Sequence, residues 1–171
     1  LVSTPIGNLG DISPRGLETL RSVSLIAAED TRVTLKLLTH FDIKKPMISY
    51  NKNNMKQRAE EILDRLERQE DVALVTDAGT PAVSDPGEDI VRLCHDRGFT
   101  AVPIPGPCAA VAALSVSGLF TGRFCFEGFL SVSNKSRRAH LLELRGETRT
   151  MIFYEAPHKL PTTLGDLFAA F

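Results

Sequence analysis

VALVTDAGTPAVSDPG, residues Val72–Gly87, carries the strongest structural signal in this sequence. It opens with alternating Val, Ala and Leu, the pattern of a strand buried within a sheet. The chain then turns through 77–81 and again through 84–87, where glycines and prolines let a ligand approach the backbone closely. Ligands of open α/β sheets bind at the carboxyl ends of the strands. The stretch therefore predicts a small-molecule site, because an ordinary strand-to-helix connection needs fewer residues.

Short apolar runs alternate with amphipathic helical patterns along the first part of the chain. The clearest helix is Met55–Glu70, which is apolar on one face and charged on the other. Besides the strand at 72–75, the apolar runs predict four more strands, at Leu1–Thr4, Leu25–Ala28, Met47–Tyr50 and Thr100–Ile104. This β-α repetition predicts an α/β fold with a parallel, five-stranded sheet covered by helices in a first domain.

A domain boundary is expected at Gly118–Gly122, where glycines interrupt the periodicity. The prediction is an N-terminal α/β domain over 1–118 and the start of a C-terminal α/β domain over 122–171. The sequence begins at Leu1 rather than Met and ends within an apolar, helix-like stretch. We therefore expect both ends to be cut and the second domain to be incomplete.

Size and composition are those of an ordinary globular protein, with 171 residues, 43% hydrophobic and 24% charged. No apolar run is long enough to span a bilayer and no signal peptide begins the sequence, so no membrane partner is expected. Three cysteines without metal or disulfide spacing predict a cytoplasmic location and no metal site. The glycine patterns of dinucleotide-binding and P-loop folds are missing.

The charge is unevenly distributed. The net charge of −1 argues against a generic nucleic-acid binder. Residues 134–150 nevertheless hold five basic side chains against two acidic ones, whereas the rest holds 15 against 19. This basic segment indicates either a local contact with an anion or a solvated helix face. Its basic residues are Lys135, Arg137, Arg138, Arg145 and Arg149.

Two further groups stand where strands are predicted to end. The sequence Glu29-Asp30-Thr31-Arg32 places charges at the carboxyl end of a strand, where they could line a cleft or cap the next helix. The turn at 105–107 leads into a helix of small residues that begins at Cys108. Cys108 could be a nucleophile, but no base stands in a recognisable pattern with it. The alternative is a small side chain that lets a ligand approach the backbone.

Five motifs then occur in order along the chain. They are TPIGNLGD at 4–11, AEDTR at 28–32, VTDAGTPAVSDPG at 75–87, PGPCA at 105–109 and FYEAPHK at 153–159. Together they closely resemble the ribosomal RNA small-subunit methyltransferase I family, the 2′-O-ribose branch of the tetrapyrrole-methylase superfamily. The resemblance covers nearly the whole chain.

This resemblance implies a two-domain methyltransferase that is not Rossmann-like, with S-adenosylmethionine in the cleft between its domains. It further implies methylation of a cytidine ribose in small-subunit ribosomal RNA, a homodimer, and a second domain that is truncated here. Under this resemblance the basic segment would contact RNA phosphates.

Positions that match the family's motifs suggest the cofactor site. Thr80 and Val83 stand where relatives carry an acidic Gly-Asp-Pro loop, and Cys108 stands where they often carry Ser. Asp77 would meet the methionine ammonium or the nearby substrate. The resemblance assigns cofactor contacts to Asn8, Leu9, Asp77, Thr80, Val83, Cys108, Ala109 and Tyr154.

Methyl transfer from a sulfonium is an in-line displacement, which depends mainly on positioning. A ribose hydroxyl is a poor nucleophile, so a base or a polarising cation would help. Glu29, Asp30 and Arg32 are the candidates, and a helix cap with salt bridges is the alternative role. Two rival functions remain: methylation of a corrin or porphyrin precursor, and RNA binding without catalysis.

Overall fold

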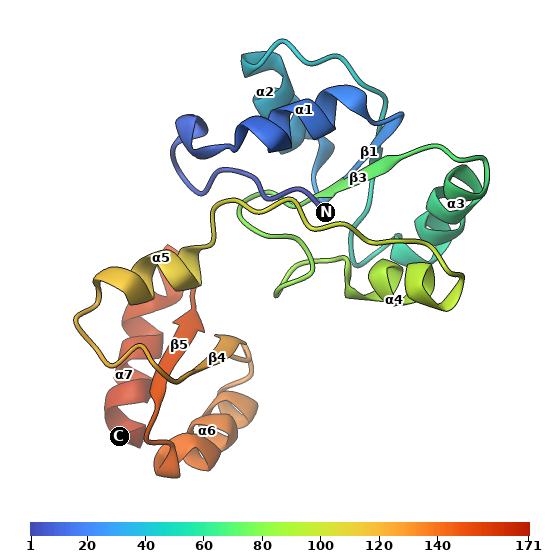
Figure 1. The fold of residues 1–171 in the computed structure, drawn as a ribbon. Helices are drawn as coiled ribbons and strands as arrows, with labels where there is room; N and C mark the ends of the chain where they lie inside the picture. The colour runs from blue at the N-terminus through green and yellow to red at the C-terminus, as the bar shows by residue number, and fades with distance from the viewer. The chain divides into compact units, whose positions relative to one another are not determined.

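The computed structural model describes all residues, 1–171, which form two compact units. The first unit is Leu1–Ala109 and the second is Ala110–Phe171. Figure 1 shows the elements of each unit. The two units meet between Ala109 and Ala110, before the predicted domain boundary at Gly118–Gly122. That predicted boundary stays a prediction.

The first unit is built on a parallel sheet, as expected. Strand β1 (Leu25–Ala28) lies between β2 (Met47–Ser49) and β3 (Val72–Val75). Both pairings are parallel, with Ile26 opposite Met47 on one side and opposite Ala73 on the other. All four residues of β1 are buried, which fits a central strand covered on both faces. The predicted α/β class is therefore confirmed.

The sheet has three strands rather than the five expected. The segments 1–4 and 100–104 form isolated bridges, Val2 with Ile104 and Thr4 with Gly79, and the N–H of Val2 donates to the carbonyl oxygen of Leu74 in β3 at 2.9 Å. The backbone of Thr4 pairs with a loop rather than with a strand. Pro103 has no N–H group to donate, which interrupts pairing of the last segment.

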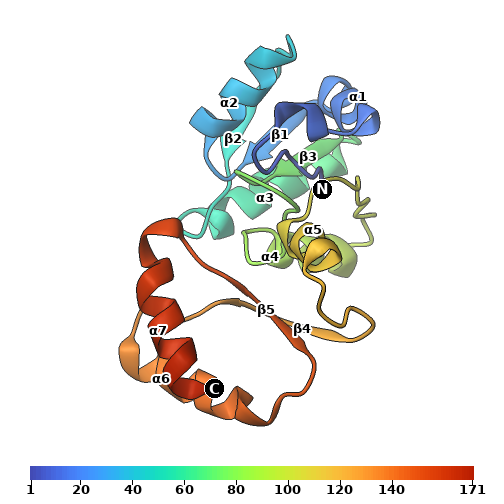
Figure 2. The same cartoon turned by 90° about the vertical axis from the view of Figure 1, so that its left-hand side faces the viewer.

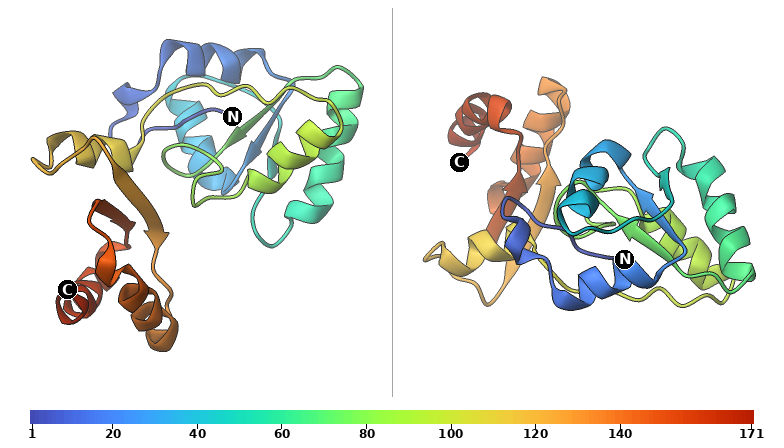
Figure 3. Two further views of the ribbon diagram at one scale, coloured as in Figure 1. Left: turned by 60° about the horizontal axis from the view of Figure 1, so that its bottom comes forward. Right: turned by 90° about the horizontal axis from the view of Figure 1, so that it is seen from above.

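Four α-helices cover this sheet. They are α1 (Pro14–Ser22), α2 (Thr31–His40), α3 (Met55–Glu67) and α4 (Glu88–Asp96), with a 3₁₀ turn, η1 (Leu9–Asp11), before α1. In Figure 3 (left), α1 lies on the opposite side of the strands from α3 and α4. Ser13 caps α1 through its side chain, and Pro14 is the first helical residue, as the sequence predicts.

Alternate residues of the strands point to two different cores. Ile26 packs with Leu20 of α1 and Leu38 of α2, whereas Ala27 packs in the cluster that holds Leu63 of α3 and Ile90 of α4. This alternation follows from the two-residue period of a strand. The first unit is therefore a three-layer arrangement of helices, sheet and helices.

The second unit contains a two-stranded parallel sheet and three α-helices (Figure 2). Its elements are α5 (Ala109–Val116), β4 (Phe124–Phe129), α6 (Asn134–Glu143), η2 (Leu144–Gly146), β5 (Thr150–Tyr154), η3 (Pro157–Lys159) and α7 (Leu160–Ala170). The first residue of α5 is the last residue of the first unit. The pairing of β4 with β5 is irregular between Phe126 and Gly128.

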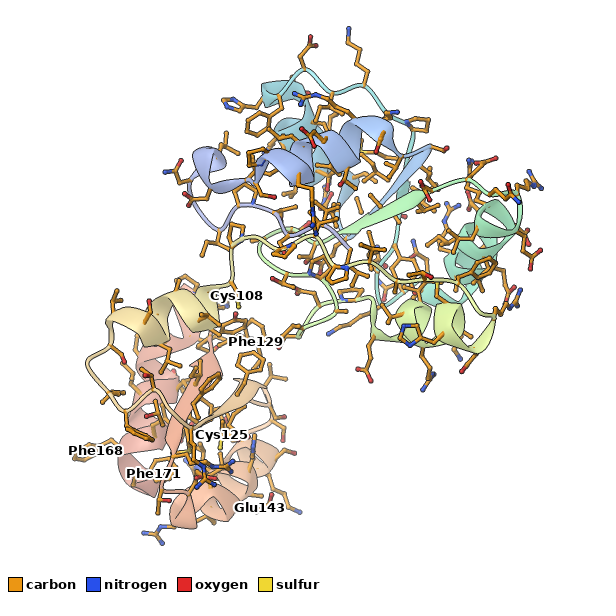
Figure 4. All side chains as sticks on the ribbon, viewed as in Figure 1. Cys108, Cys125, Phe129, Glu143, Phe168 and Phe171 are labelled. Carbon is orange, nitrogen blue, oxygen red and sulfur yellow. The ribbon has the colours of Figure 1, made fainter.

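The core of the second unit is small. Leu130, Leu141 and Ala170 form its cluster of buried apolar residues, and Phe153 and Leu167 pack against them. Other apolar side chains remain exposed: Phe168 is 90% exposed and Phe171 57%, and Figure 4 labels Phe168 on α7 and Phe171 directly after it. No helix of either unit has the length and apolar character needed to cross a bilayer.

Candidate functional site

The loops at the carboxyl edge of the first unit's sheet are tied to one another. Thr4 and Gly79 exchange two backbone hydrogen bonds, at 2.9 and 3.1 Å. The hydroxyl of Thr80 lies 3.1 Å from that of Ser3 and donates to the carbonyl oxygen of Pro107 at 3.3 Å. Three turns far apart in sequence therefore meet at one edge, as predicted.

The loop after β3 follows an unusual backbone path. Gly79 and Gly87 have φ angles of 86° and 138°, and the non-glycine residues Ala82 and Ser84 have 67° and 68°. Non-glycine residues in this region are uncommon and are strained. A Cβ atom on Gly87 would lie 2.7 Å from Cδ2 of Leu74. Tight packing against β3 therefore fixes the end of the loop.

Carboxylates from two strand ends form a hydrogen-bonded cluster at the same edge. Glu29 Oε2 accepts from the hydroxyl of Thr76 at 2.6 Å and from the backbone N–H of Asp77 at 3.3 Å. Asp77 Oδ1 in turn accepts from the backbone N–H of Asp30 at 3.1 Å. This cluster joins the end of β1 to the end of β3.

Burial and repulsion by neighbouring carboxylates raise the pKa of Asp77 and of Asp85, which follows in the same loop. Burial raises the pKa of Asp77, and the nearby charge of Glu29 raises it further. Burial also raises the pKa of Asp85, although a hydrogen bond from Thr76 opposes that shift. Perturbed carboxyl groups of this kind are typical of functional sites.

Asp30 and Arg32, two of the three residues predicted to act in catalysis, form a helix cap and a salt bridge. This is the alternative role that the sequence left open for them. Asp30 Oδ1 accepts from the backbone N–H of Arg32 at 2.8 Å, and its Oδ2 lies 2.6 Å from the Arg32 guanidinium. These hydrogen bonds lower the pKa of Asp30 to about 2. Asp30 is therefore a weak base, whereas Glu29 stands beside the more basic Asp77.

The predicted cofactor residues of the first loop and of the loop after β3 present mixed chemistry. The side chain of Asn8 caps η1 by accepting from the N–H of Gly10 at 3.0 Å. Leu9 and Val83 are 40% and 45% exposed, so each presents an apolar surface. The hydroxyl of Thr80 holds neighbouring loops together, as described above.

The remaining predicted cofactor residues belong to the start of α5 and the end of β5. Cys108 is half-buried just before α5, which begins at Ala109 (Figure 4). The hydroxyl of Tyr154 accepts from the backbone N–H of Ala110 at 3.1 Å. Tyr154 thereby caps α5, which satisfies one of the free N–H groups of its first turn. No local sequence signal indicates this contact, because the two residues are 44 positions apart.

The basic segment divides into paired and exposed side chains. Arg137 is only 7% exposed, and its guanidinium lies 2.6 Å from Asp166 of α7. Its other guanidinium hydrogen bonds go to Asn134 and to the carbonyl oxygens of residues 131 and 132. Arg149 pairs with Glu147 at 2.6 Å. The structure thus gives Arg137 a role in packing α6 on α7 and argues against its direct contact with RNA.

Lys135, Arg138 and Arg145 remain exposed. Arg138 reaches within 3.5 Å of Asp166 but keeps 70% of its side-chain surface accessible. The solvent-accessible part of the basic segment is therefore smaller than its composition suggests.

Sequence reasoning missed Ser3, Thr76 and Asp85. Ser3 and Thr76 show their roles only when the strand ends come together, so a single sequence holds no signal for them. Asp85 lies within a predicted turn, where Asp usually serves the turn itself. No group of three or more His, Cys, Asp or Glu side chains is arranged to hold a metal ion.

Solved structures with a similar fold include a cobalt precorrin-4 methyltransferase, a uroporphyrin-III C-methyltransferase and a diphthine synthase. A cobalt precorrin-4 methyltransferase superposes with a TM-score of 0.70 at 16% identity, over 99% of this chain and 73% of that one. The uroporphyrin-III C-methyltransferase of Thermus thermophilus, complexed with S-adenosylhomocysteine, gives 0.64 at 16% identity, over 99% and 74%. At this identity the likeness shows the fold alone.

Relatives detected by sequence have a much higher identity to this chain than these solved structures have. The ribosomal RNA small subunit methyltransferase I of Synechocystis sp. is 55% identical over 167 residues, which is 98% of this chain and 60% of that protein. The protein of the same name from Escherichia coli O157:H7 is 50% identical over 169 residues, which is 99% of this chain and 59% of that protein. This chain thus spans about 60% of the length of these relatives. Since residues 1–170 match the family described as tetrapyrrole (corrin/porphyrin) methylases, the chain belongs to that family.

Proposed function

We propose that this chain is part of an enzyme that methylates the 2′-oxygen of a cytidine ribose in small-subunit ribosomal RNA. The observation that carries the proposal is identity of 50% or more with relatives named ribosomal RNA small subunit methyltransferase I, over nearly all of this chain. The tied loops at the carboxyl edge of the sheet support it, because they supply a rigid frame for a small ligand.

The methyl donor in this proposal is S-adenosylmethionine. A fold neighbour was crystallised with S-adenosylhomocysteine, the product of such a donor. The residues present fit the group, because the turns at Gly79 and Pro107 are held together through Thr4 and Thr80 and leave backbone groups at one edge of the sheet. The residues proposed to hold the cofactor are Asn8, Leu9, Thr80, Val83, Cys108, Ala109 and Tyr154, whereas Asp77 would meet either the methionine ammonium or the nearby substrate.

When bound, the cofactor supplies an electrophilic methyl group on a sulfonium. The protein would hold the ribose hydroxyl in line with that group and take its proton. Glu29 stays in the proposal because Thr76 fixes its carboxylate beside Asp77. Asp30 and Arg32 stay in it as the pair that fixes the start of α2.

Several wider features belong to the same proposal. Lys135, Arg138 and Arg145 would bind RNA phosphates, and Arg137 and Arg149 would support that segment. A homodimer would cover exposed apolar side chains of the second unit. The proposal also includes a cytoplasmic location, where the ribosomal substrate is found, and the division into domains 1–118 and 122–171.

Methyl transfer from radiolabelled S-adenosylmethionine tests the proposal. We expect the full-length protein to label small ribosomal subunits that lack the modification, and nuclease mapping to place the methyl group on a cytidine ribose. Labelling of corrin or porphyrin precursors instead would support the rival methyltransferase. Calorimetry that detects no cofactor binding would support a non-catalytic RNA-binding protein.

A further inference from the structure

A small cavity opens at the carboxyl end of β3, within the first unit. It lies between the first loop, the helix α2 and the residues that follow β3, and its volume is about 190 Å³. It is lined by Thr4, Pro5, Leu9, Val33, Leu37 and Asp77, with Thr34, Lys36 and Thr76 completing it.

The walls of this cavity are mostly apolar. Leu9 and Val33 line it yet are 40% and 39% exposed, so both the first loop and α2 present apolar surface to solvent there. Leu37 lies among the same lining residues and is buried at 8% exposure. The volume equals the share of roughly six liquid water molecules. A single aromatic ring suits that space better than a double ring or a whole nucleotide.

One charged acceptor borders this apolar space. Asp77 Oδ1 already accepts from the N–H of Asp30 at 3.1 Å, which fixes the carboxylate beside the cavity. Burial and the nearby Glu29 disfavour the negative charge of Asp77. A hydrogen bond donated by a neutral group of a ligand would therefore stabilise the charged carboxylate. Lys36 is exposed and lies among the lining residues, so its ammonium group is placed to contact a phosphate.

We propose that this cavity binds one unstacked pyrimidine base of the RNA substrate, and that Asp77 selects a base with an amino group. The flat ring would pack between Leu9 and Val33, as flipped bases pack between apolar side chains. Its exocyclic amine would donate to the carboxylate of Asp77, the contact by which acids recognise cytosine. Uracil would present a carbonyl oxygen to the same carboxylate and be repelled. The inference rests on the proposed RNA methylation and assigns Asp77 to the substrate rather than to the cofactor.

The test measures kcat/KM on small subunits that carry either cytidine or uridine at the mapped position. The wild-type protein should prefer cytidine by about 5- to 150-fold, the range of one base-specific hydrogen-bonded contact. Asp77→Asn should bring the two substrates within about 3-fold, because an amide also donates to the uracil oxygen. The Kd of S-adenosylhomocysteine should stay at the wild-type value.

A second pair of variants tests the cavity itself. Val33→Trp should fill it and reduce kcat/KM for the cytidine substrate at least about tenfold without changing S-adenosylhomocysteine binding. The matched control is Leu35→Trp, at an exposed site on the same helix that does not line the cavity, and it should retain activity.

Each of the following outcomes would overturn the inference. Asp77→Asn could keep the full preference for cytidine, or it could weaken S-adenosylhomocysteine binding while leaving that preference intact, which would return Asp77 to the cofactor. Val33→Trp could match its control. A wild-type protein that labels neither RNA contradicts the proposed function as well, whereas equal labelling of cytidine and uridine contradicts the base assignment alone.

Discussion

Replacing Gly87 by Ala should destabilise the first unit, because two separate penalties meet at this residue. Its φ of 138° lies where a side chain is strained, at about 1–3 kcal/mol. The new Cβ would also lie 2.7 Å from Cδ2 of Leu74 and 3.1 Å from Cβ of Ala82. Leu74 is 93% buried, so its side chain has little room to move, and overpacking of this kind costs about 1–3 kcal/mol. The free energy of unfolding should therefore fall by about 2–6 kcal/mol.

Urea denaturation followed by circular dichroism measures this change, and Gly98→Ala is the matched control. Gly98 also has a positive φ, 77°, but no atom lies within 4 Å of its added Cβ. The free energy of unfolding of the control should fall only by the contribution of backbone strain, about 1–2 kcal/mol. Equal losses at Gly87 and Gly98 would refute the reasoning, because they would mean that the close packing against Leu74 contributes nothing.

Three further predictions concern single side chains. Arg137→Ala should lower the free energy of unfolding by about 3–5 kcal/mol by removing a buried, hydrogen-bonded charge, whereas Arg138→Ala should change it by less than about 1 kcal/mol; denaturation curves of the two variants compare them. Tyr154→Phe should leave α5 without its cap, and hydrogen exchange should show faster exchange at the first turn of that helix with little change elsewhere. Asp77→Asn should raise the stability above that of the wild-type protein at pH 7, because the raised pKa of Asp77 means that its ionised form disfavours the folded state. That difference should shrink as the pH falls through the raised pKa and the carboxyl becomes neutral, which melting temperatures at several pH values will reveal.

Local sequence chemistry predicted much of the fold and of the candidate site. The buried strand at 72–75 and the turns after it follow from residue types within sixteen positions. The cap at Ser13 and the charged group at 29–32 likewise follow from residue types that lie close together in sequence. Since β-α repetition predicts a parallel sheet, and loops at carboxyl ends of parallel strands share one edge, the meeting of the loops also followed from the sequence.

Hydrogen bonds made across long sequence distances account for what was missed in the sheet. Segment 1–4 has the composition of a strand, but its backbone hydrogen bonds are divided among Leu74 of β3, Ile104 and the loop residue Gly79, so no continuous ladder forms. The positive φ angles of Ala82 and Ser84 had no signal either, because neither residue type prefers that conformation. Both features arise when the loop closes over the strand ends, so they depend on tertiary contacts.

The basic segment shows how a local pattern can be correct in its chemistry and incomplete in its structure. A run of Lys and Arg on a helix usually lies in solvent, and α6 keeps that property at Lys135 and Arg138. Arg137 differs because a carboxylate on α7, 29 residues later, meets its guanidinium inside the second unit. A buried charge is tolerated only with such a partner, so the position of Asp166 decides which arginine turns inward. If the segment binds RNA, the salt dependence of binding should therefore respond to changes at the exposed cations, whereas Arg137→Ala should act through the stability of the unit.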